Sequence, residues 1–421
     1  MEVIQEFGPW FVGLALLFGS YMCWGIGAND VANAMGTSVG SKAVSIKTAI
    51  IIAAVFEFAG VVIAGGHVTE TIRKGIVDPT PLVGHPELLV LGMLASLLAA
   101  AIWLMVASAK GWPVSTTHSI VGALVGFALV GVGSDAVKWS SLTGIVSSWV
   151  VSPVVGGLFA FILTLSVMKL VLNTETPFAN AKKWGPYYLF LVGFVIGLVT
   201  LFKGLKHLKL NLTVAQSFLA ATAVGGFIAF IGWLIIRRIQ MDPKADKTFH
   251  FASVEKVFGP LQVFTACAMA FAHGSNDVAN GVGPLASVYG IVQSGGEIVK
   301  SASLPFWILL LGGIGIVVGL ATLGVRVIKT IGEGITELTP SRGFCAELAA
   351  ACTVVLASRT GLPVSTTHIA VGAVMGVGMA RGIAALDLRV VGQIVVSWLI
   401  TIPVGAVLSA LIFFLLRVIF L

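Results

Sequence analysis

Two short polar motifs interrupt long apolar runs in this chain, and they are near copies of each other. GANDVANAMG covers residues 27–36, and GSNDVANGVG covers residues 274–283. Residues three and four apart share one face of a helix, so each motif can present its aspartate and both asparagines together. Carboxylate and amide oxygens are hard ligands that suit a cation such as Na⁺. The six predicted cation ligands are Asn29, Asp30, Asn33, Asn276, Asp277 and Asn280.

A second repeated motif, PVSTTH, occupies residues 113–118 and 363–368. Proline is well placed at a helix start, because the backbone N–H that it lacks would be unpaired there. Hydroxyls and free N–H groups in a first turn form an anion site, so two such starts facing each other would surround a small tetrahedral oxyanion. Helix capping alone accounts for one hydroxyl of each motif and is the alternative. The predicted oxyanion ligands are Ser115, Thr116, Thr117, Ser365, Thr366 and Thr367.

Two histidines and two glutamates complete the set of candidate residues. His118 and His368 close the PVSTTH motifs, where an imidazole can donate to an anion, shuttle protons or bond a neighbouring helix. Glu57 and Glu347 fall inside apolar segments, where each needs a partner or a proton, and a role in cation coupling is favoured. The sequence offers no obvious partner for Glu57. Two arginines near Glu347 are candidate partners for it, namely Arg342 and Arg359.

The composition places these residues in a membrane. Of 421 residues, 57% are hydrophobic and 10% are charged, and the mean hydropathy is +1.02. Soluble proteins carry about 25% charged residues. Apolar runs of about 20 residues, which recur along this chain, can cross a ~30 Å hydrocarbon core. The sequence therefore predicts an all-α polytopic protein in the lipid bilayer. The net charge of +7 lies mostly in loops and gives no reason to expect a nucleic-acid partner.

The two motif aspartates carry charges that their neighbours in sequence do not offset. No lysine or arginine lies within ten residues of Asp30 or Asp277. An unpaired carboxylate is costly in lipid and marks an ion pathway, so a bound cation is the expected partner. Glycines around both motifs predict a locally unwound backbone, which is tolerated at membrane depth only around a cavity. The alternative is hydrogen bonding between helices without a cation.

Apolar periodicity predicts about twelve transmembrane segments, with those after Pro113 and Pro363 either crossing fully or re-entering. The repeated motifs divide the chain into a first repeat (1–172), two linking spans with a cytoplasmic loop (173–256) and a second repeat (257–421). The expected spans are 8–27, 47–67, 88–109, 114–132, 143–171, 187–205, 212–238, 257–273, 303–329, 344–358, 364–381 and 390–418.

The number of crossings fixes the relative orientation of the two repeats. An odd number of expected spans separates equivalent points, so the repeats face opposite ways, as in secondary transporters whose site lies at the repeat interface. This inversion fails if one ambiguous segment in each repeat re-enters. The side that bears both termini receives fewer lysines and arginines than the other side. By the positive-inside rule the termini lie outside and the 237–256 loop lies in the cytoplasm.

The duplicated GxNDVAN and PVSTTH motifs, in this order within both halves, resemble those of the inorganic phosphate transporter (PiT) family, which includes sodium–phosphate symporters. The resemblance covers nearly the whole chain. It implies import of inorganic phosphate, driven by Na⁺ in some members and by H⁺ in others. The residues that match the family's signature aspartates, signature serines and transport-critical glutamates are Asp30, Asp277, Ser115, Ser365, Glu57 and Glu347.

The motifs and the resemblance together lead us to expect a sodium-coupled phosphate symporter, not an enzyme, that works by alternating access in the cell membrane. Na⁺ would bind the Asn-Asp motifs and phosphate the Ser-Thr-Thr helix starts. A proton-coupled phosphate or sulfate permease is the close alternative, because no residue excludes either. An anion channel would not need the carboxylates, and an intramembrane enzyme has only the Ser–His proximity of STTH in its favour. The extra spans between the repeats suggest a homodimer.

Overall fold

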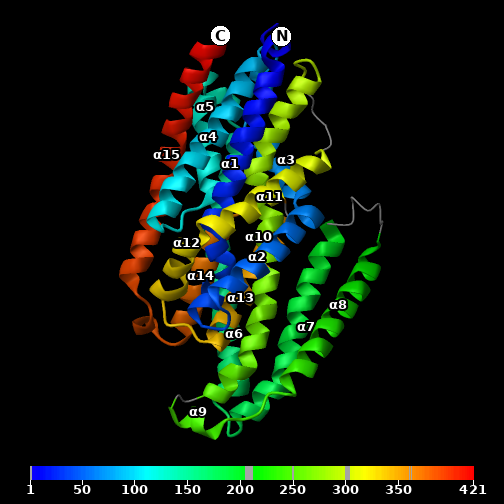
Figure 1. Ribbon diagram of the computed structural model, residues 1–421, viewed down its shortest axis with the longest axis vertical. Coiled ribbons are helices and arrows are strands. Elements are labelled where there is room, and N and C mark those ends of the chain that lie inside the picture. Colours follow the sequence, from blue (N-terminus) through cyan, green and yellow to red (C-terminus); the bar gives the residue numbers. More distant parts are fainter. Residues whose placement is uncertain (1, 204–211, 249–250, 299–303, 360, 362) are drawn as a thin grey trace.

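The computed structural model describes residues 2–203, 212–248, 251–298, 304–359, 361 and 363–421, and these residues fold into helices joined by short connections (Figure 1). Within these ranges the β-structure is one isolated bridge between Val77 and Val137. The helices of four residues or more with α-helical geometry are α1 (Glu2–Gly40), α2 (Ile46–Ala64), α3 (Gly66–Lys74), α4 (Pro86–Lys110), α5 (Thr116–Gly131), α6 (Trp139–Val167), α7 (Pro177–Lys203), α8 (Val214–Ile236), α9 (Pro243–Thr248), α10 (Ala252–Gln293), α11 (Phe306–Thr322), α12 (Gly324–Gly334), α13 (Pro340–Arg359), α14 (Thr366–Ala380) and α15 (Leu388–Phe420).

The expected spans fall on these helices, and the span 303–329 falls on α11 and α12, which meet at an angle of 68°. By length and composition, seven helices of the described ranges are long and apolar enough to cross a membrane, or eight with this bent pair. The segments after Pro113 and Pro363 form α5 and α14, of 16 and 15 residues. At 1.5 Å per residue these helices reach only about 24 Å, short of a ~30 Å core. The chain is thus an all-α polytopic protein with one bent pair, α11 and α12, and two short helices, α5 and α14. These two short helices are called the half-length helices below.

The backbone stays helical through both Asn-Asp motifs, so the expectation of an unwound backbone there is wrong. α1 runs for 39 residues and α10 for 42 without a break. The motif glycines have a different role, because they let neighbouring backbones approach closely. A side chain at Gly27 would collide with the backbone carbonyl of Ile316, and one at Gly274 with that of Glu57. Such close approach at small residues is how helices pack in lipid.

The two motif helices, α1 and α10, pack against each other in opposite directions. Gly8 and Gly19 of α1 lie against Val292 and Leu285 of α10, so residue numbers rise on one helix as they fall on the other. In Figure 1, α1 begins at the end of the molecule where both termini lie, whereas α10 begins at the opposite end, next to α9. The structure therefore has the inverted relation between the repeats that the sequence predicts.

Each repeat also packs one of its helices on the half-length helix of the other repeat. Gly122 of α5 contacts the backbone of α15 at Ile402, and Gly372 of α14 contacts the backbone of α6 at Pro153. Both contacts are backbone to backbone. The half-length helices are therefore held from the opposite repeat, so neither repeat completes the central region alone.

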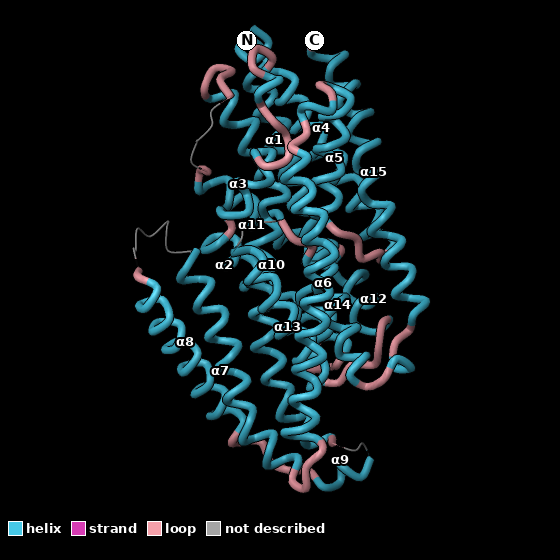
Figure 2. The backbone as a smooth tube through the Cα atoms, turned by 180° about the vertical axis from the view of Figure 1, so that it is seen from behind, coloured by secondary structure: helices cyan, strands magenta, loops and turns pink. Residues whose placement is uncertain are grey.

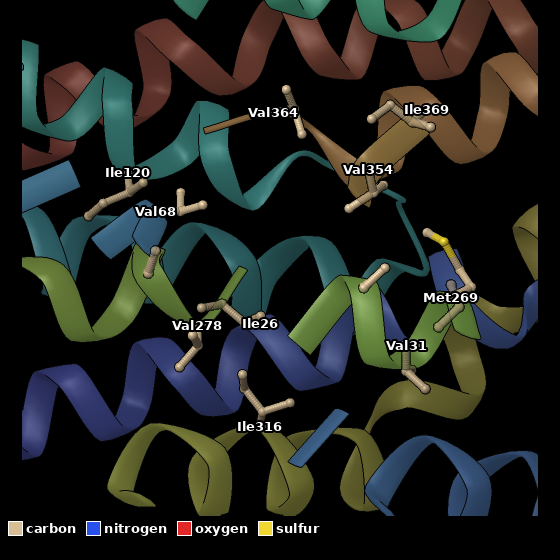
Figure 3. Packing of buried hydrophobic residues seen from close by; sticks show 14 of the residues in the cluster. Ile26, Val31, Val68, Ile120, Met269, Val278, Ile316, Val354, Val364 and Ile369 are labelled. Atoms are coloured by element: carbon tan, nitrogen blue, oxygen red, sulfur yellow. The ribbon is translucent and has the colours of Figure 1, made fainter. Parts of the chain in front are cut away.

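The centre of the molecule is largely apolar around the motif side chains. Figure 3 shows aliphatic side chains from α1, α10 and α11 gathered there, among them Ile26, Val278 and Ile316. The α7–α8 hairpin stands at one side of the molecule, away from α15, in both the front and the back view (Figures 1 and 2). The motifs thus lie inside the packed helix core, and the linking hairpin lies beside it.

Candidate functional site

The two Asn-Asp motifs meet at the contact between α1 and α10, and all six of their predicted ligand residues are buried. Helix geometry explains this placement, because Asn-Asp-x-x-Asn puts three polar groups on adjoining positions of one face. Since α1 and α10 are antiparallel neighbours, these faces come together from opposite repeats. The polar cluster is therefore shared by the two halves of the chain.

His273 joins the two aspartates, although the sequence interpretation did not single it out. Its Nε2 lies 2.9 Å from Asp277 Oδ2 and 3.7 Å from Asp30 Oδ2. All three side chains are fully buried. One ligand atom from each of the three residues lies within 4.8 Å of the others, which is a spacing that a single cation could bridge. His273 precedes Asp277 by one helical turn, and this i,i+4 spacing could have drawn attention to it.

Glu57 of α2 completes this cluster from a third helix. His273 Nδ1 lies 3.3 Å from Glu57 Oε1, so the imidazole lies between Glu57 and the two aspartates. Glu57 is fully buried, and neither of its carboxyl oxygens has a hydrogen-bond partner within the described structure. Three carboxyl groups thus surround one imidazole in a site closed to solvent. Buried polar atoms without hydrogen-bond partners are rare in folded proteins, so the carboxyl group of Glu57 is a candidate functional group.

The first asparagine of each motif holds the chain just before a half-length helix. Asn29 Nδ2 donates to the carbonyl of Trp112 at 2.9 Å, and Asn29 Oδ1 accepts from the N–H of Val114 at 3.2 Å. In the other repeat, Asn276 Nδ2 donates to the carbonyl of Val364 at 3.2 Å. These amides fix where the PVSTTH segments begin, and the Oδ1 of Asn29 is already used in doing so.

The second asparagine of each motif reaches across to the opposite repeat. Asn33 Nδ2 donates to Thr367 Oγ1 at 2.9 Å, and Asn280 Nδ2 donates to Thr117 Oγ1 at 3.3 Å. Within the described ranges, the Oδ1 atoms of both asparagines are buried and have no partner. These two carbonyl oxygens are therefore available to a cation.

The Ser-Thr-Thr segments form the starts of α5 and α14, as predicted. Ser115 and Ser365 are the N-caps, and each accepts from the N–H of the histidine three residues later. Thr116 donates to Asp30 at 2.7 Å, and the equivalent Thr366 donates to Asp277 at 2.6 Å. The hydroxyl of Thr117 donates to the carbonyl of Val364, and that of Thr367 donates to the carbonyl of Val114. Each carbonyl lies just before the opposite helix start. The two helix starts therefore face each other beside the carboxylate cluster.

His118 and His368 follow the two helix starts, and their rings contact each other. Their ring centroids are 4.4 Å apart, and each ring packs on a tryptophan of its own repeat, Trp149 for His118 and Trp398 for His368. His368 Nδ1 lies 3.1 Å from the carbonyl of Trp149. Pro153 lacks the N–H that this carbonyl would bond in an unbroken helix, so the histidine takes the vacant position.

Glu347 of α13 is held by hydroxyls and not by Arg342, one of the two arginines proposed for it. Its Oε1 accepts from Thr37 and Ser38 at 2.5 Å each, and its Oε2 accepts from Thr265 at 2.8 Å. Arg342 instead lies 3.7 Å from Glu337, so its predicted pairing with Glu347 is wrong. The side chain of the other candidate, Arg359, is outside the described residues. The arginines were chosen because they are close to Glu347 in the sequence, whereas the hydroxyls that bind it come from α1 and α10, far away along the chain.

This combination of inverted membrane repeats and half-length helices around a buried polar centre defines a secondary-transporter type of protein. The model of the phosphate transporter family matches residues 26–409. The chain belongs to that family.

Individual relatives agree with this assignment. A protein of Haemophilus influenzae that carries the name phosphate permease is 50% identical over 420 residues, covering 100% of both chains. Inorganic phosphate transporter 2-1, chloroplastic, of Arabidopsis thaliana is 46% identical, covering 94% of this chain and 70% of the relative. A solved structure described as the sodium-dependent phosphate transporter is 42% identical, with a TM-score of 0.89, covering 97% of this chain and 99% of that one. The chain is therefore a multi-pass membrane transporter and not an enzyme.

Proposed function

We propose that this protein imports inorganic phosphate by sodium-coupled symport with alternating access. The observation that supports it most is the placement of Asp30 and Asp277, from opposite repeats, in one fully buried cluster. Within the described part of the chain, His273 is the one basic side chain that contacts both of them. Two carboxylates carry more negative charge than a single imidazole can offset, and a transported cation would supply the remaining positive charge. The sodium dependence in the description of the related solved structure supports the choice of ion.

The cations would bind the oxygens of the two Asn-Asp motifs. Asp30 and Asp277 supply the charge, and the free Oδ1 atoms of Asn33 and Asn280 supply neutral ligands. Asn29 and Asn276 belong to the same predicted ligand set, and their amides also position the helix starts. Oxygen ligands of this kind suit Na⁺ better than a soft metal ion.

Phosphate would bind between the starts of α5 and α14. The first-turn N–H groups of a helix attract an anion, and the two starts carry a hydroxyl at each of three positions. In the present arrangement the threonine hydroxyls donate to Asp30, Asp277 and backbone carbonyls. Cations at the aspartates would release those hydroxyls to donate to phosphate, which gives a physical reason for coupling. The proposed phosphate ligands are Ser115, Thr116, Thr117, Ser365, Thr366 and Thr367.

Four further residues would couple ion binding to movement. Glu57 contacts His273 and through it both aspartates, and Glu347 ties α13 to the end of α1. His118 and His368 connect the helix starts to α6 and α15. The repeats 1–172 and 257–421 would rock against each other around the site, with 173–256 linking them. We also propose a homodimer in the cell membrane with both termini outside.

A proton-coupled phosphate or sulfate permease is the second candidate. The observation that favours it is the contact of His273 with three carboxyl groups, because an imidazole among carboxylates can carry a proton as well as neighbour a cation.

The test is the substitution of each motif aspartate in protein reconstituted into proteoliposomes. We expect Asp30→Asn and Asp277→Asn each to abolish sodium-driven accumulation of labelled phosphate. Asp135→Asn, at an exposed position outside the cluster, should leave uptake unchanged. Full sodium-driven uptake by both cluster variants would refute the assignment of these aspartates as cation ligands.

A further inference from the structure

A pocket of about 560 Å³ opens at the surface between α15, the end of α4 and α12. Its walls are mostly apolar and include Trp103, Ile394, Val396 and Ile400. Trp112 and Pro113, in the segment that leads into the first helix start, also line it. The proposed transport mechanism makes no use of this pocket.

Two exposed cations lie at the edge of the pocket. Lys110 places its Nζ 4.5 Å from the ring centroid of Trp112, which lines the pocket. Arg326 of α12 donates to the carbonyl of Ala109 at 3.2 Å, and Thr330, one turn later on the same face, lines the pocket. Among the described residues, those that line the pocket include no carboxylate. The site thus combines an apolar interior with a positively charged, tryptophan-lined edge.

We propose that this pocket binds one anionic phospholipid, with an acyl chain inside and its phosphate beside Lys110 and Arg326. Basic pockets between membrane helices bind acidic lipid head groups, and lysine and arginine near a head group each add to the attraction. Free inorganic phosphate would find the two cations but would gain nothing from the apolar walls. Charge complementarity at the edge together with the apolar interior therefore selects an amphiphile.

The lipid also contacts the segment that carries the first helix start. Trp112 lines the pocket, and its carbonyl accepts from Asn29 Nδ2 at 2.9 Å. Val114 N–H donates to the same asparagine, and Thr116 follows with its bond to Asp30. A bound lipid would hold this segment in place, so its loss would slow transport without removing any ligand of the transported ions.

The test uses native mass spectrometry of the full chain purified from vesicles of phosphatidylglycerol and phosphatidylcholine. Val396→Trp fills the pocket, and Val395→Trp on the same helix is its control, because Val395 does not line the pocket. The double variant Lys110→Gln/Arg326→Gln removes the edge charges. Its control, Lys183→Gln/Arg238→Gln, removes two charges from α7 and from the end of α8, on the other side of the molecule.

We expect the wild-type chain and both controls to retain one phosphatidylglycerol, Val396→Trp to retain none, and the Lys110/Arg326 variant to bind it about tenfold more weakly or worse. Phosphate uptake by the wild type should also be slower in vesicles of phosphatidylcholine alone. Equal lipid retention by Val396→Trp and Val395→Trp would overturn the proposal. Release of the lipid by inorganic phosphate would identify the pocket as a substrate entrance instead, and loss of a dimer in Val396→Trp would identify a protein interface. The lipid measurement does not depend on which ion drives transport.

Discussion

At the scale of single residues, His273 has the most connected position in the site. It contacts carboxyl groups from three helices, namely Asp30 of α1, Asp277 of its own helix α10, and Glu57 of α2. Buried carboxylates without partners are strongly unfavourable, so the imidazole stabilises this cluster whenever no cation occupies it. The residue links the cation ligands of both repeats to Glu57.

Replacing this histidine should make the Tm of the protein depend more strongly on sodium. Removing one partner of a buried ion pair costs about 3–5 kcal/mol, so His273→Ala should lower the Tm. Because a ligand that binds the folded state stabilises it, the Tm of the variant should rise more with NaCl than that of the wild type, with choline chloride as the salt control. His85→Ala, at an exposed histidine, is the matched control. A Tm shift equal to that of the control would contradict this role.

The sequence was sufficient to find the repeated polar residues that the structure brings together, but not their partners. Comparison of the two Asn-Asp motifs brought out the shared residues and hid His273, because the equivalent position in the first copy is Ile26. No partner for Glu57 could be predicted from the sequence, since the imidazole of His273 beside it is more than two hundred residues away along the chain. The bond of Asn29 to the carbonyl of Trp112 also joins residues far apart in the sequence, with a separation of 83. Such contacts depend on the packing of whole helices.

At the scale of helices, two prolines give α6 and α15 different hydrogen bonding. Pro153 of α6 leaves the carbonyl of Trp149 without its usual helical partner, and His368 takes that bond. Pro403 of α15 instead leaves the carbonyl of Leu399. Membrane helices tolerate proline where another group satisfies the freed carbonyl. The bond from His368 therefore joins α14 of one repeat to α6 of the other.

Replacing Pro153 should distinguish a role of the His368–Trp149 hydrogen bond in transport from an effect of the proline on helix stability. In Pro153→Ala the new N–H can bond the carbonyl of Trp149 and compete with His368. An interior proline costs a helix about 3 kcal/mol, so we expect a higher Tm but slower phosphate uptake in proteoliposomes. Pro403→Ala should raise the Tm without slowing uptake. Equal uptake rates in the two variants would show that the bond has no part in transport.

Apolar periodicity predicted the position of the helices better than their continuity. Each expected span falls largely on one helix or, for 303–329, on the bent pair α11 and α12, because an apolar run of about 20 residues in lipid must satisfy its backbone hydrogen bonds internally. Continuity through the Asn-Asp motifs was missed, since the glycines that suggested unwinding serve close packing, as Gly27 does against Ile316. The sharp bend between α11 and α12 also carries no clear signal in the sequence.

At the scale of the whole molecule, both termini lie at one end and the loop around α9 lies at the other (Figure 1). An inverted pair of repeats is suited to alternating access, because each face of the site is closed by equivalent elements of opposite halves. The reciprocal packing of α5 on α15 and of α14 on α6 fits this arrangement. The distribution of lysine and arginine predicts that the end with both termini lies outside and the α9 end lies in the cytoplasm.

Labelling single cysteines would test the orientation. In a background with the half-buried Cys267 replaced by serine, a membrane-impermeant maleimide should label Glu2→Cys on intact cells. It should label Arg238→Cys only after the cells are permeabilised, since that residue lies at the α9 end. The three other cysteines are buried and serve as the unlabelled background. The reverse pattern would place the termini in the cytoplasm.

The most direct test of sodium-coupled phosphate import is labelled phosphate uptake by wild-type protein in proteoliposomes. The vesicles would have an inward Na⁺ gradient, an inward H⁺ gradient or neither, each with and without excess sulfate. We predict accumulation above equilibrium only with the Na⁺ gradient, unchanged by sulfate. Accumulation driven by the H⁺ gradient alone would contradict sodium coupling and assign the carboxylates and His273 to proton transfer.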